Sequence, residues 1–343
     1  MTTTKRFQSP LWLAMNVTAI SLLIPAAFIL VAGKNPVTAY FALLTYTLGT
    51  WNGFSEVLTQ CIPLTLVGLG VAVAFRAGVF NIGGDGQLMF GAIVSFALAP
   101  VFAGLPVPLG VMAFLAAGFL GGGALGAFVG WLKARFQASE IISTIVLNFI
   151  VLQLLSWLIR GPLQEPAKTM PWSDYLPETL LLPNLIEGSR VHYGLVVALL
   201  AVAAMAVVVR KTAFGFRLTV VGQNPSAARY AGLREGRVMI WAMLVSGGLA
   251  GLAGSVQVAG ILERLQDDFA TGYGQAAIAI ALMARLSPML VPFTSLLFAI
   301  FYVGAGVLQR EAAVPFPIVY IIEGVVIFGF LFFDAVSRKR NGV

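Results

Sequence analysis

The sequence predicts an all-α membrane protein of about ten transmembrane helices, with both termini in the cytoplasm. Of its 343 residues, 59% are hydrophobic and only 10% are charged, whereas a soluble domain carries roughly 25% charged residues. The apolar residues also form continuous runs of helical spanning length instead of the alternating pattern of barrel strands. The single cysteine, Cys61, excludes an internal disulfide. The whole chain, 1–343, is therefore predicted to be one transmembrane domain.

Ten apolar stretches are long enough to cross a bilayer as helices. They lie at 12–32, 57–76, 86–103, 107–132, 139–159, 192–209, 238–260, 273–291, 293–310 and 315–333. The stretch 36–50 is too short and too rich in threonine to span easily, and it is predicted to be an interfacial or re-entrant piece. The first stretch follows Lys5 and Arg6 as a signal peptide would. Its length and the lack of a small-residue cleavage site before Lys34 favour a retained helix.

The basic residues predict the orientation, because cytoplasmic loops are enriched in lysine and arginine. Placing both termini inside puts 15 of the 21 basic residues in the cytoplasm. This orientation makes 160–191 an extracytoplasmic loop and 210–237 a cytoplasmic loop with six basic residues. The net charge of +7 is then explained as an orientation signal, and no nucleic-acid partner is expected.

Catalytic motifs are missing from the sequence. No phosphate-binding loop of the form G-x-x-x-x-G-K-S/T occurs. The one histidine, His192, lies far from Cys61 along the chain, and no Cys/His cluster has metal-ligand spacing. The sequence therefore favours the passage of a solute over chemistry.

Glycines recur at fixed spacing in two of the predicted spans. One span carries a glycine every four residues, at Gly118, Gly122, Gly126 and Gly130. Gly247 and Gly251 repeat the spacing in a later span. Small residues on one helix face let backbones approach closely, so these spans are predicted to pack tightly against other helices.

The segment 78–87 (GVFNIGGDGQ) is the most unusual stretch of the chain. Two interpretations stay open: a tight cytoplasmic turn, or a broken helix whose freed backbone groups line a cavity. Its last four residues, 84–87 (GDGQ), are similar to 272–275 (GYGQ), an echo of the first string. The two strings precede spans that cross the membrane in opposite directions in the predicted topology. The echo points to an inverted repeat of five plus five helices.

Polar residues also fall inside the predicted spans. Thr144 and Asn148 share one helix face, and Glu323 lies mid-span. Polar groups in a bilayer need partners, so each residue either bonds to a neighbouring helix or lines a pathway.

The cytoplasmic loop contains a short predicted helix. Asn224 is a favourable N-cap and Pro225 a favourable first residue. The residues 226–231 favour helix, and Gly232 can end it. A short helix in a basic loop is typical of a docking element, and a solvated loop is the alternative.

Three segments together resemble permeases of bacterial ATP-binding cassette (ABC) importers, in the superfamily that includes ribose and branched-chain amino acid permeases. The string at 222–232 (GQNPSAARYAG) resembles their coupling region. The strings at 80–87 (FNIGGDGQ) and at 144–150 (TIVLNFI) with 160–163 (RGPL) resemble F-N-I-G-x-E/D-G-Q and T-I-M-L-N-Y-I…R-G-P-L of the nucleoside (simple-sugar-like) branch. The resemblance covers about 57–333. It departs at Asp85, where glutamate is usual, and at Phe149, where tyrosine is usual.

The resemblance implies a multi-pass permease of the bacterial inner membrane that imports nucleosides by alternating access and binds no cofactor. Sugars or branched-chain amino acids are alternative substrates, and an ion-coupled secondary transporter is the rival class. The implied partners are an ABC ATPase that uses ATP, a second permease subunit forming a heterodimer, an extracytoplasmic substrate-binding lipoprotein, and membrane lipids. The residues expected along the substrate pathway are Asn148, Phe149, Gln257, Tyr273, Asn81, Asp85 and Gln87. The residues expected to couple to the ATPase are Asn224, Pro225, Ala228, Arg229, Tyr230 and Gly232.

Overall fold

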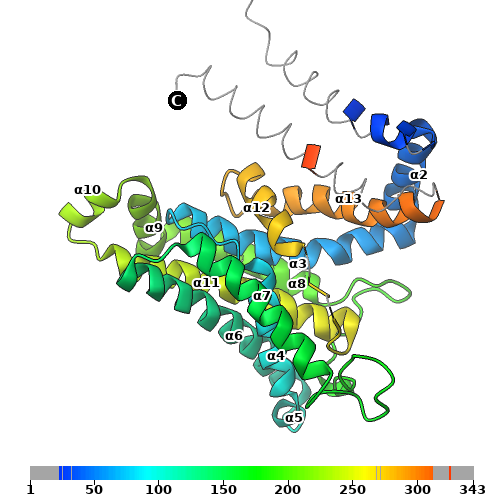
Figure 1. The fold of residues 1–343 in the computed structure, drawn as a ribbon, viewed down its shortest axis with the longest axis horizontal. Helices are drawn as coiled ribbons and strands as arrows, with labels where there is room; N and C mark the ends of the chain where they lie inside the picture. The colour runs from blue at the N-terminus through cyan, green and yellow to red at the C-terminus, as the bar shows by residue number, and fades with distance from the viewer. Residues whose placement is uncertain are drawn as a thin grey trace, which may run out of the picture. The chain divides into compact units, whose positions relative to one another are not determined.

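The computed structural model describes residues 23–24, 26–31, 33–267, 269–270, 272–311 and 324–325, which form helices joined by loops (Figure 1). The helices are α2 (Pro36–Gly49), α3 (Trp51–Arg76), α4 (Gly84–Ala97), α5 (Ala99–Phe102), α6 (Val107–Phe136), α7 (Glu140–Ile159), α8 (Gly194–Lys211), α9 (Ala213–Gln223), α10 (Pro225–Tyr230), α11 (Glu235–Gln257), α12 (Tyr273–Met283) and α13 (Val291–Glu311). A 3-10 helix, η1 (Glu178–Leu180), and a π-helical turn, η2 (Val258–Leu262), complete the described elements. The chain divides into two compact units, one of residues 58–297 and one of 1–57 with 298–343.

Six helices of the described part are long and apolar enough to cross a bilayer. They are α3, α6, α7, α8, α11 with its π-helical turn, and α13. They confirm six of the predicted spans, with ends that differ from the prediction by a few residues. Continuous apolar runs were sufficient to find these helices, because a helix in lipid needs an apolar side chain at nearly every outward position.

The predicted span at 86–103 is divided in the structure between two consecutive helices. In the structure α4 has 14 residues and ends at Ala97, which gives a length of about 21 Å. The short α5 follows after Leu98 with Pro100 in its first turn. Proline has no N–H to donate to the preceding turn, so the helical hydrogen bonds cannot continue unchanged through this position.

The predicted span at 273–291 is wrong as one continuous helix. In the structure α12 has 11 residues and ends at Met283. Arg285 and Leu286 then adopt positive φ angles of 50° and 56°. Two successive left-handed residues turn the chain out of the helix, and α13 starts a new helix at Val291.

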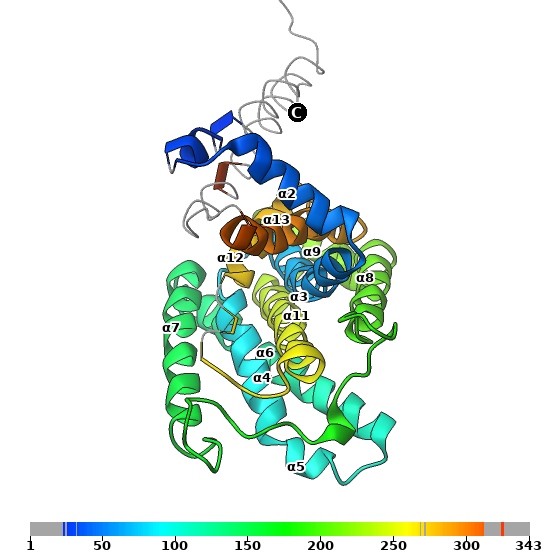
Figure 2. The same cartoon turned by 90° about the vertical axis from the view of Figure 1, so that its right-hand side faces the viewer.

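The core of the larger unit is the contact between α6 and α11, with α4 packed against both (Figure 2). A Cβ atom added at Gly122 would lie 2.3 Å from the carbonyl oxygen of Gly247, and one added at Gly251 would lie 2.1 Å from that of Gly118. On α4, a Cβ atom added at Gly91 would lie 2.3 Å from the Cα of Gly251. The backbones touch, so side chains are excluded here. The glycine spacing therefore predicted this packing correctly.

The smaller unit contains α2, which covers the stretch 36–50. This helix starts at Asn35, whose side chain accepts a hydrogen bond from the N–H of Val37 at 2.9 Å. Its 14 residues, about 21 Å, are too few to cross a bilayer upright, as predicted. The core of this unit consists of Ile29, Ala39, Leu43 and Leu308. The predicted spans at 12–32 and 315–333 lie mostly outside the described residues, and Glu323 lies outside them entirely.

The loop 160–191 is tied to the chain that follows α11. The N–H of Ser173 donates to the carbonyl of Leu265 at 2.9 Å, and the N–H of Leu265 donates back to the Ser173 hydroxyl at 2.8 Å. The guanidinium of Arg264 lies 3.7 Å from the ring centroid of Trp172, which is a close cation–π contact. These contacts hold the loop as an ordered strap across the C-terminal end of α11.

Candidate functional site at the junction of two short helices

The chain between α3 and α4 is not helical, and most of it is buried, although Gly78 and Phe80 are exposed. Gly78 makes the turn with a φ angle of +73°. Val79 and Asn81 follow with 0% and 1% of their surface exposed, and Asp85 is also buried in the first turn of α4. A cytoplasmic turn would lie in water throughout. From Asn81 to Gln87 the structure therefore favours the second interpretation of 78–87, a helix broken inside the bundle, while the exposed Gly78 and Phe80 form a turn at its start.

Asn81 organises this interruption through hydrogen bonds. Its Nδ2 donates to Oε1 of Gln87 and to Oγ of Ser246, each at 2.8 Å. Its Oδ1 accepts from the N–H of Gly83 at 3.0 Å and from Nε2 of Gln87 at 3.1 Å. Ser246 stands eleven residues after the start of α11, about 16 Å along that helix. The cluster therefore lies well inside the bundle, where polar groups need such partners.

Asn148 on α7 binds the backbone of the same segment. Its Oδ1 accepts from the N–H of Gly86 at 2.8 Å, and its Nδ2 donates to the carbonyl of Ile82 at 3.1 Å. A Cβ atom at Gly86 would lie 2.6 Å from Oδ1 of Asn148, so this contact requires glycine. The interhelical hydrogen bond, one of the two interpretations of Asn148, is thus observed. A role in the substrate pathway stays a prediction.

The start of α4 meets the start of α12 at Asp85. The Oδ1 atom of Asp85 accepts a hydrogen bond from the N–H of Gly274 at 2.6 Å, and a Cβ atom at Gly84 would lie 2.8 Å from the Cα of Gly274. Beside this contact, the hydroxyl of Tyr273 accepts from Nε2 of Gln60 at 2.7 Å. Helix N-termini carry partial positive charge. One carboxylate therefore compensates two N-termini, and the two echoing segments of the sequence lie in contact.

The remaining predicted pathway residues lie apart from this hydrogen-bond network. Phe149 points away from the core of the unit with 65% of its surface exposed, and Gln257 is buried at the end of α11, where the π-helical turn begins. The network also includes Gln60, Ser246 and Gly274, which were not among the predicted residues. The sequence carries a signal for two of them: Gly274 belongs to the echo, and Gln60 is a lone amide in an apolar run.

The predicted helix in the basic loop is confirmed as α10. The side chain of Asn224 accepts from the N–H of Ala227 at 2.9 Å, and Pro225 is the first helical residue. Gly232 follows the helix with a φ angle of +77°. This helix has one buried side chain, Ala228, while Tyr230 is 94% exposed. It is therefore anchored by a single small residue and presents the rest of its surface outward.

The neighbouring helix α9 was not predicted, and it links α10 to the broken segment. It begins after Thr212, whose hydroxyl accepts from the N–H of Gly215 at 3.3 Å. At its end, a Cβ atom on Gly222 would lie 2.1 Å from the carbonyl oxygen of Arg76. A Cβ atom on Gly78 would lie 3.2 Å from the Cα of Gly222. The end of α9 therefore rests directly on the turn that leads into the junction.

These features define a class of protein: a multi-pass membrane transport subunit with broken helices in its core and an exposed helix in a basic loop. The comparison with known families then gives the family. Over residues 53–331 the chain matches the family described as "Branched-chain amino acid transport system / permease component", and it belongs to that family of ABC transporter permeases. It is a transport subunit without catalytic activity, it binds no cofactor, and ATP is hydrolysed by a partner ATPase. The rival class of ion-coupled transporters is thereby excluded.

Three relatives are similar along nearly their whole length. The glucose ABC transporter permease protein TsgB13 of Haloferax volcanii is 36% identical, with 97% of this chain and 91% of the relative covered. The guanosine permease NupP of Bacillus subtilis is 34% identical (88% and 87% covered), and the nucleoside permease NupB of Lactococcus lactis is 32% identical (89% and 86% covered). Haloferax volcanii and Bacillus subtilis each have a second matching permease with the same named solute, at 26% and 27% identity.

Proposed function

We propose that this ABC importer permease carries a neutral, hydroxylated solute, and that the solute is a nucleoside. The observation that supports the proposal is the position of Asp85. In transporters with broken helices, the N-termini of the half-helices commonly bind an anionic group of the substrate. Here a carboxylate of the protein already takes that position, through its hydrogen bond to Gly274. An amino acid carboxylate would have to compete with it, whereas a neutral solute would not.

The other side chains of the junction also suit a neutral solute. Asn81, Gln87 and Asn148 contribute amides, which are bonded to one another and to the backbone in this conformation and would exchange those partners for the solute. Tyr273 contributes an aromatic ring with a hydroxyl. Amides and hydroxyls can match the edges of a base and the hydroxyls of a sugar, and rings can stack on a flat base. A hexose is the second candidate, because the glucose permease of Haloferax volcanii is 36% identical over 97% of this chain.

In the proposed mechanism, α10 transmits the motion of the ATPase. This helix presents Arg229 and Tyr230 to the partner, and α9 carries its movement to Gly222. The contact of Gly222 with Arg76 and Gly78 passes the displacement to the broken segment, so that the helices switch between inward-open and outward-open packings.

The proposed assembly contains a second permease, an ATPase and an extracytoplasmic binding lipoprotein. The paired relatives in two organisms support a heterodimer of permeases. We place the complex in the plasma membrane, which is the inner membrane if the organism is a bacterium. The archaeal glucose permease makes an archaeal plasma membrane the alternative.

Uptake into proteoliposomes tests the substrate. The complex would be reconstituted with its binding protein and ATP inside the vesicles, and labelled guanosine and labelled glucose would be supplied in parallel. We expect saturable guanosine uptake that other nucleosides reduce and leucine does not. Uptake of glucose that nucleosides do not reduce would favour the second candidate. Uptake of leucine would contradict the neutral-solute reasoning, and vesicles with a non-hydrolysable ATP analogue serve as the control.

A further inference from the structure

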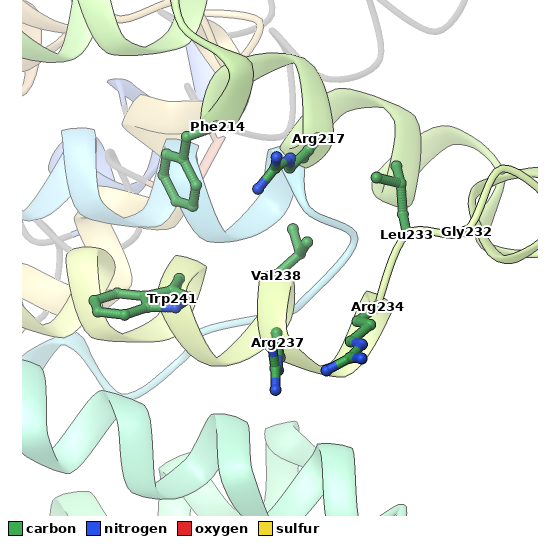
Figure 3. Close-up of a pocket in the computed structure, with 8 residues that line it drawn as sticks. All are labelled: Phe214, Arg217, Gly232, Leu233, Arg234, Arg237, Val238 and Trp241. Atoms are coloured by element: carbon green, nitrogen blue, oxygen red, sulfur yellow. The ribbon is translucent and has the colours of Figure 1, made fainter.

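A groove of 380 Å³ lies between α9 and the start of α11, apart from the buried junction (Figure 3). It is lined by Phe214, Arg217, Gly232, Leu233, Arg234, Arg237, Val238 and Trp241. In Figure 3, Arg217 reaches from α9 into the space beside α11, while Arg234 and Arg237 lie next to each other at the beginning of α11. Three positive charges from two elements therefore line one groove, Arg217 from α9 and the other two from the start of α11.

The charge of this groove is not balanced within the described part of the chain. Arg217, Arg234 and Arg237 are exposed, and none of them forms an ion pair with a described carboxylate. The nearby Arg229 behaves differently, because it pairs with Glu235. No acidic residue is among those that line the groove. Three guanidinium groups without an acidic partner among the described residues favour an anionic ligand.

The same groove has an apolar side. Trp241 is 55% exposed and Phe214 is half-buried, while Val238 closes the floor. Arg237 and Trp241 are four residues apart and share one face of α11, so the tryptophan lies about 6 Å deeper along the helix axis. Because α11 with its π-helical turn is one of the spanning helices, this order runs from the helix end toward the bilayer interior.

We propose that the groove binds the headgroup of an anionic phospholipid, with the phosphate at the three arginines and the acyl chains along Trp241. Arginine matches phosphate with parallel hydrogen bonds, and tryptophan is enriched where a helix crosses the membrane surface. Basic pockets between spanning helices are suited to anionic headgroups. A docking surface for a soluble partner alone would not need an exposed tryptophan within the spanning segment.

A lipid in this groove would contact both α9 and α11. It would therefore hold the helix that carries Gly222 at a fixed distance from the core helix. The inference rests on the membrane topology and not on the proposed substrate, so the uptake experiment above can fail without affecting it.

Quenching of tryptophan fluorescence by brominated lipids tests the proposal. The assembled transporter would be placed in nanodiscs of phosphatidylcholine, and brominated phosphatidylglycerol or brominated phosphatidylcholine would be added. The difference between the wild type and Trp241→Phe isolates the signal of Trp241. We expect the anionic lipid to quench it at lower concentration than the neutral lipid, and millimolar inorganic phosphate to leave the quenching unchanged.

A matched pair of double variants then separates the groove from overall charge. Arg234→Gln with Arg237→Gln removes two groove charges. Arg210→Gln with Lys211→Gln removes two exposed charges at the end of α8 that do not line the groove. At roughly 1 kcal/mol for each basic residue near the surface, the groove variant should need about 30-fold more anionic lipid, and the control should match the wild type.

Four results would overturn the inference. The first is equal quenching of Trp241 by the anionic and the neutral lipid, and the second is an equal loss of affinity for anionic lipid in both double variants. The third is loss of quenching when inorganic phosphate is added. The fourth is a groove variant that keeps its preference for anionic lipid but no longer binds the ATPase. The last result would assign the groove to the ATPase. Size-exclusion elution and thermal stability of each variant show that the variant is folded.

Discussion

Replacing Asp85 by alanine should loosen the joint between α4 and α12. The variant leaves the N–H of Gly274 without its 2.6 Å acceptor in a buried position. A hydrogen bond to a charged group contributes roughly 1.5–3 kcal/mol, and each uncompensated helix N-terminus costs roughly 0.3–1 kcal/mol more. We expect the free energy of unfolding to fall by about 3 kcal/mol, and solute uptake to fall with it.

Denaturant titration of the purified permease in detergent, together with uptake by the assembled transporter, measures both effects. Asp85→Glu keeps the charge and should restore most of the stability and uptake that alanine removes. Ser95→Ala is the matched control, because Ser95 is also buried in α4 but donates only to the carbonyl of Ala92 within its own helix. That control should cost less than about 1 kcal/mol. If Asp85→Ala is no less stable than Ser95→Ala, the carboxylate does not hold the joint.

Three further outcomes are expected. Gly222→Ala places a Cβ atom 2.1 Å from the carbonyl oxygen of Arg76, so this variant should reduce solute uptake strongly. Gly104→Ala is the control: its Cβ atom would have its nearest contact at 3.7 Å, so uptake should stay unchanged. Tyr230→Glu changes a side chain that is 94% exposed, so it should leave the melting temperature unchanged. It should nevertheless uncouple ATP hydrolysis from uptake, and normal coupled uptake would contradict the role of α10. Burial lowers the pKa of His192 from 6.5 to about 4, so protons bind the unfolded chain first and stability should fall by about 3 kcal/mol as pH drops from above 6.5 to below 4. Thermal melts at pH 7.5 and pH 5 should show about 2 kcal/mol of this loss, because pH 5 is still above the folded-state pKa, and His192→Asn should flatten it.

The long helices and their tightest contacts could be predicted because each follows from a local pattern. Continuous apolar runs define the spanning helices, and the glycine every fourth residue from Gly118 to Gly130 defines the face of α6 that meets α11. The cap at Asn224 and the turn at Gly232 defined α10 within one residue. In all three cases the residues that determine the structure are neighbours on one helix.

The short helices could not be predicted, because their ends are set by contacts between distant segments. Apolar residues continue past the end of α4, so hydropathy gave no reason to stop that helix. Past the end of α12 the sequence does change, at Arg285 and Pro288, but it does not show that the chain turns at Arg285 and Leu286. The start of α4 depends on Asn148 of α7 and Ser246 of α11, which supply the partners that the interrupted backbone needs. A sequence pattern shows that such polar residues exist, but it does not show which backbone groups they will reach.

In the mechanism proposed above, the contact at Gly222 connects an exposed helix to a buried site. Side chains absorb small displacements by changing rotamer, whereas two backbones in contact cannot. Between α9 and the turn at Gly78 no side chain intervenes, since both contact positions are glycine and the approach includes the carbonyl of Arg76. From that turn only two residues separate Gly78 from Asn81, whose amide binds both α4 and α11. In the proposed mechanism a shift of α9 therefore reaches the hydrogen bonds of the junction through backbone contacts, and such contacts leave little room for the displacement to be absorbed on the way.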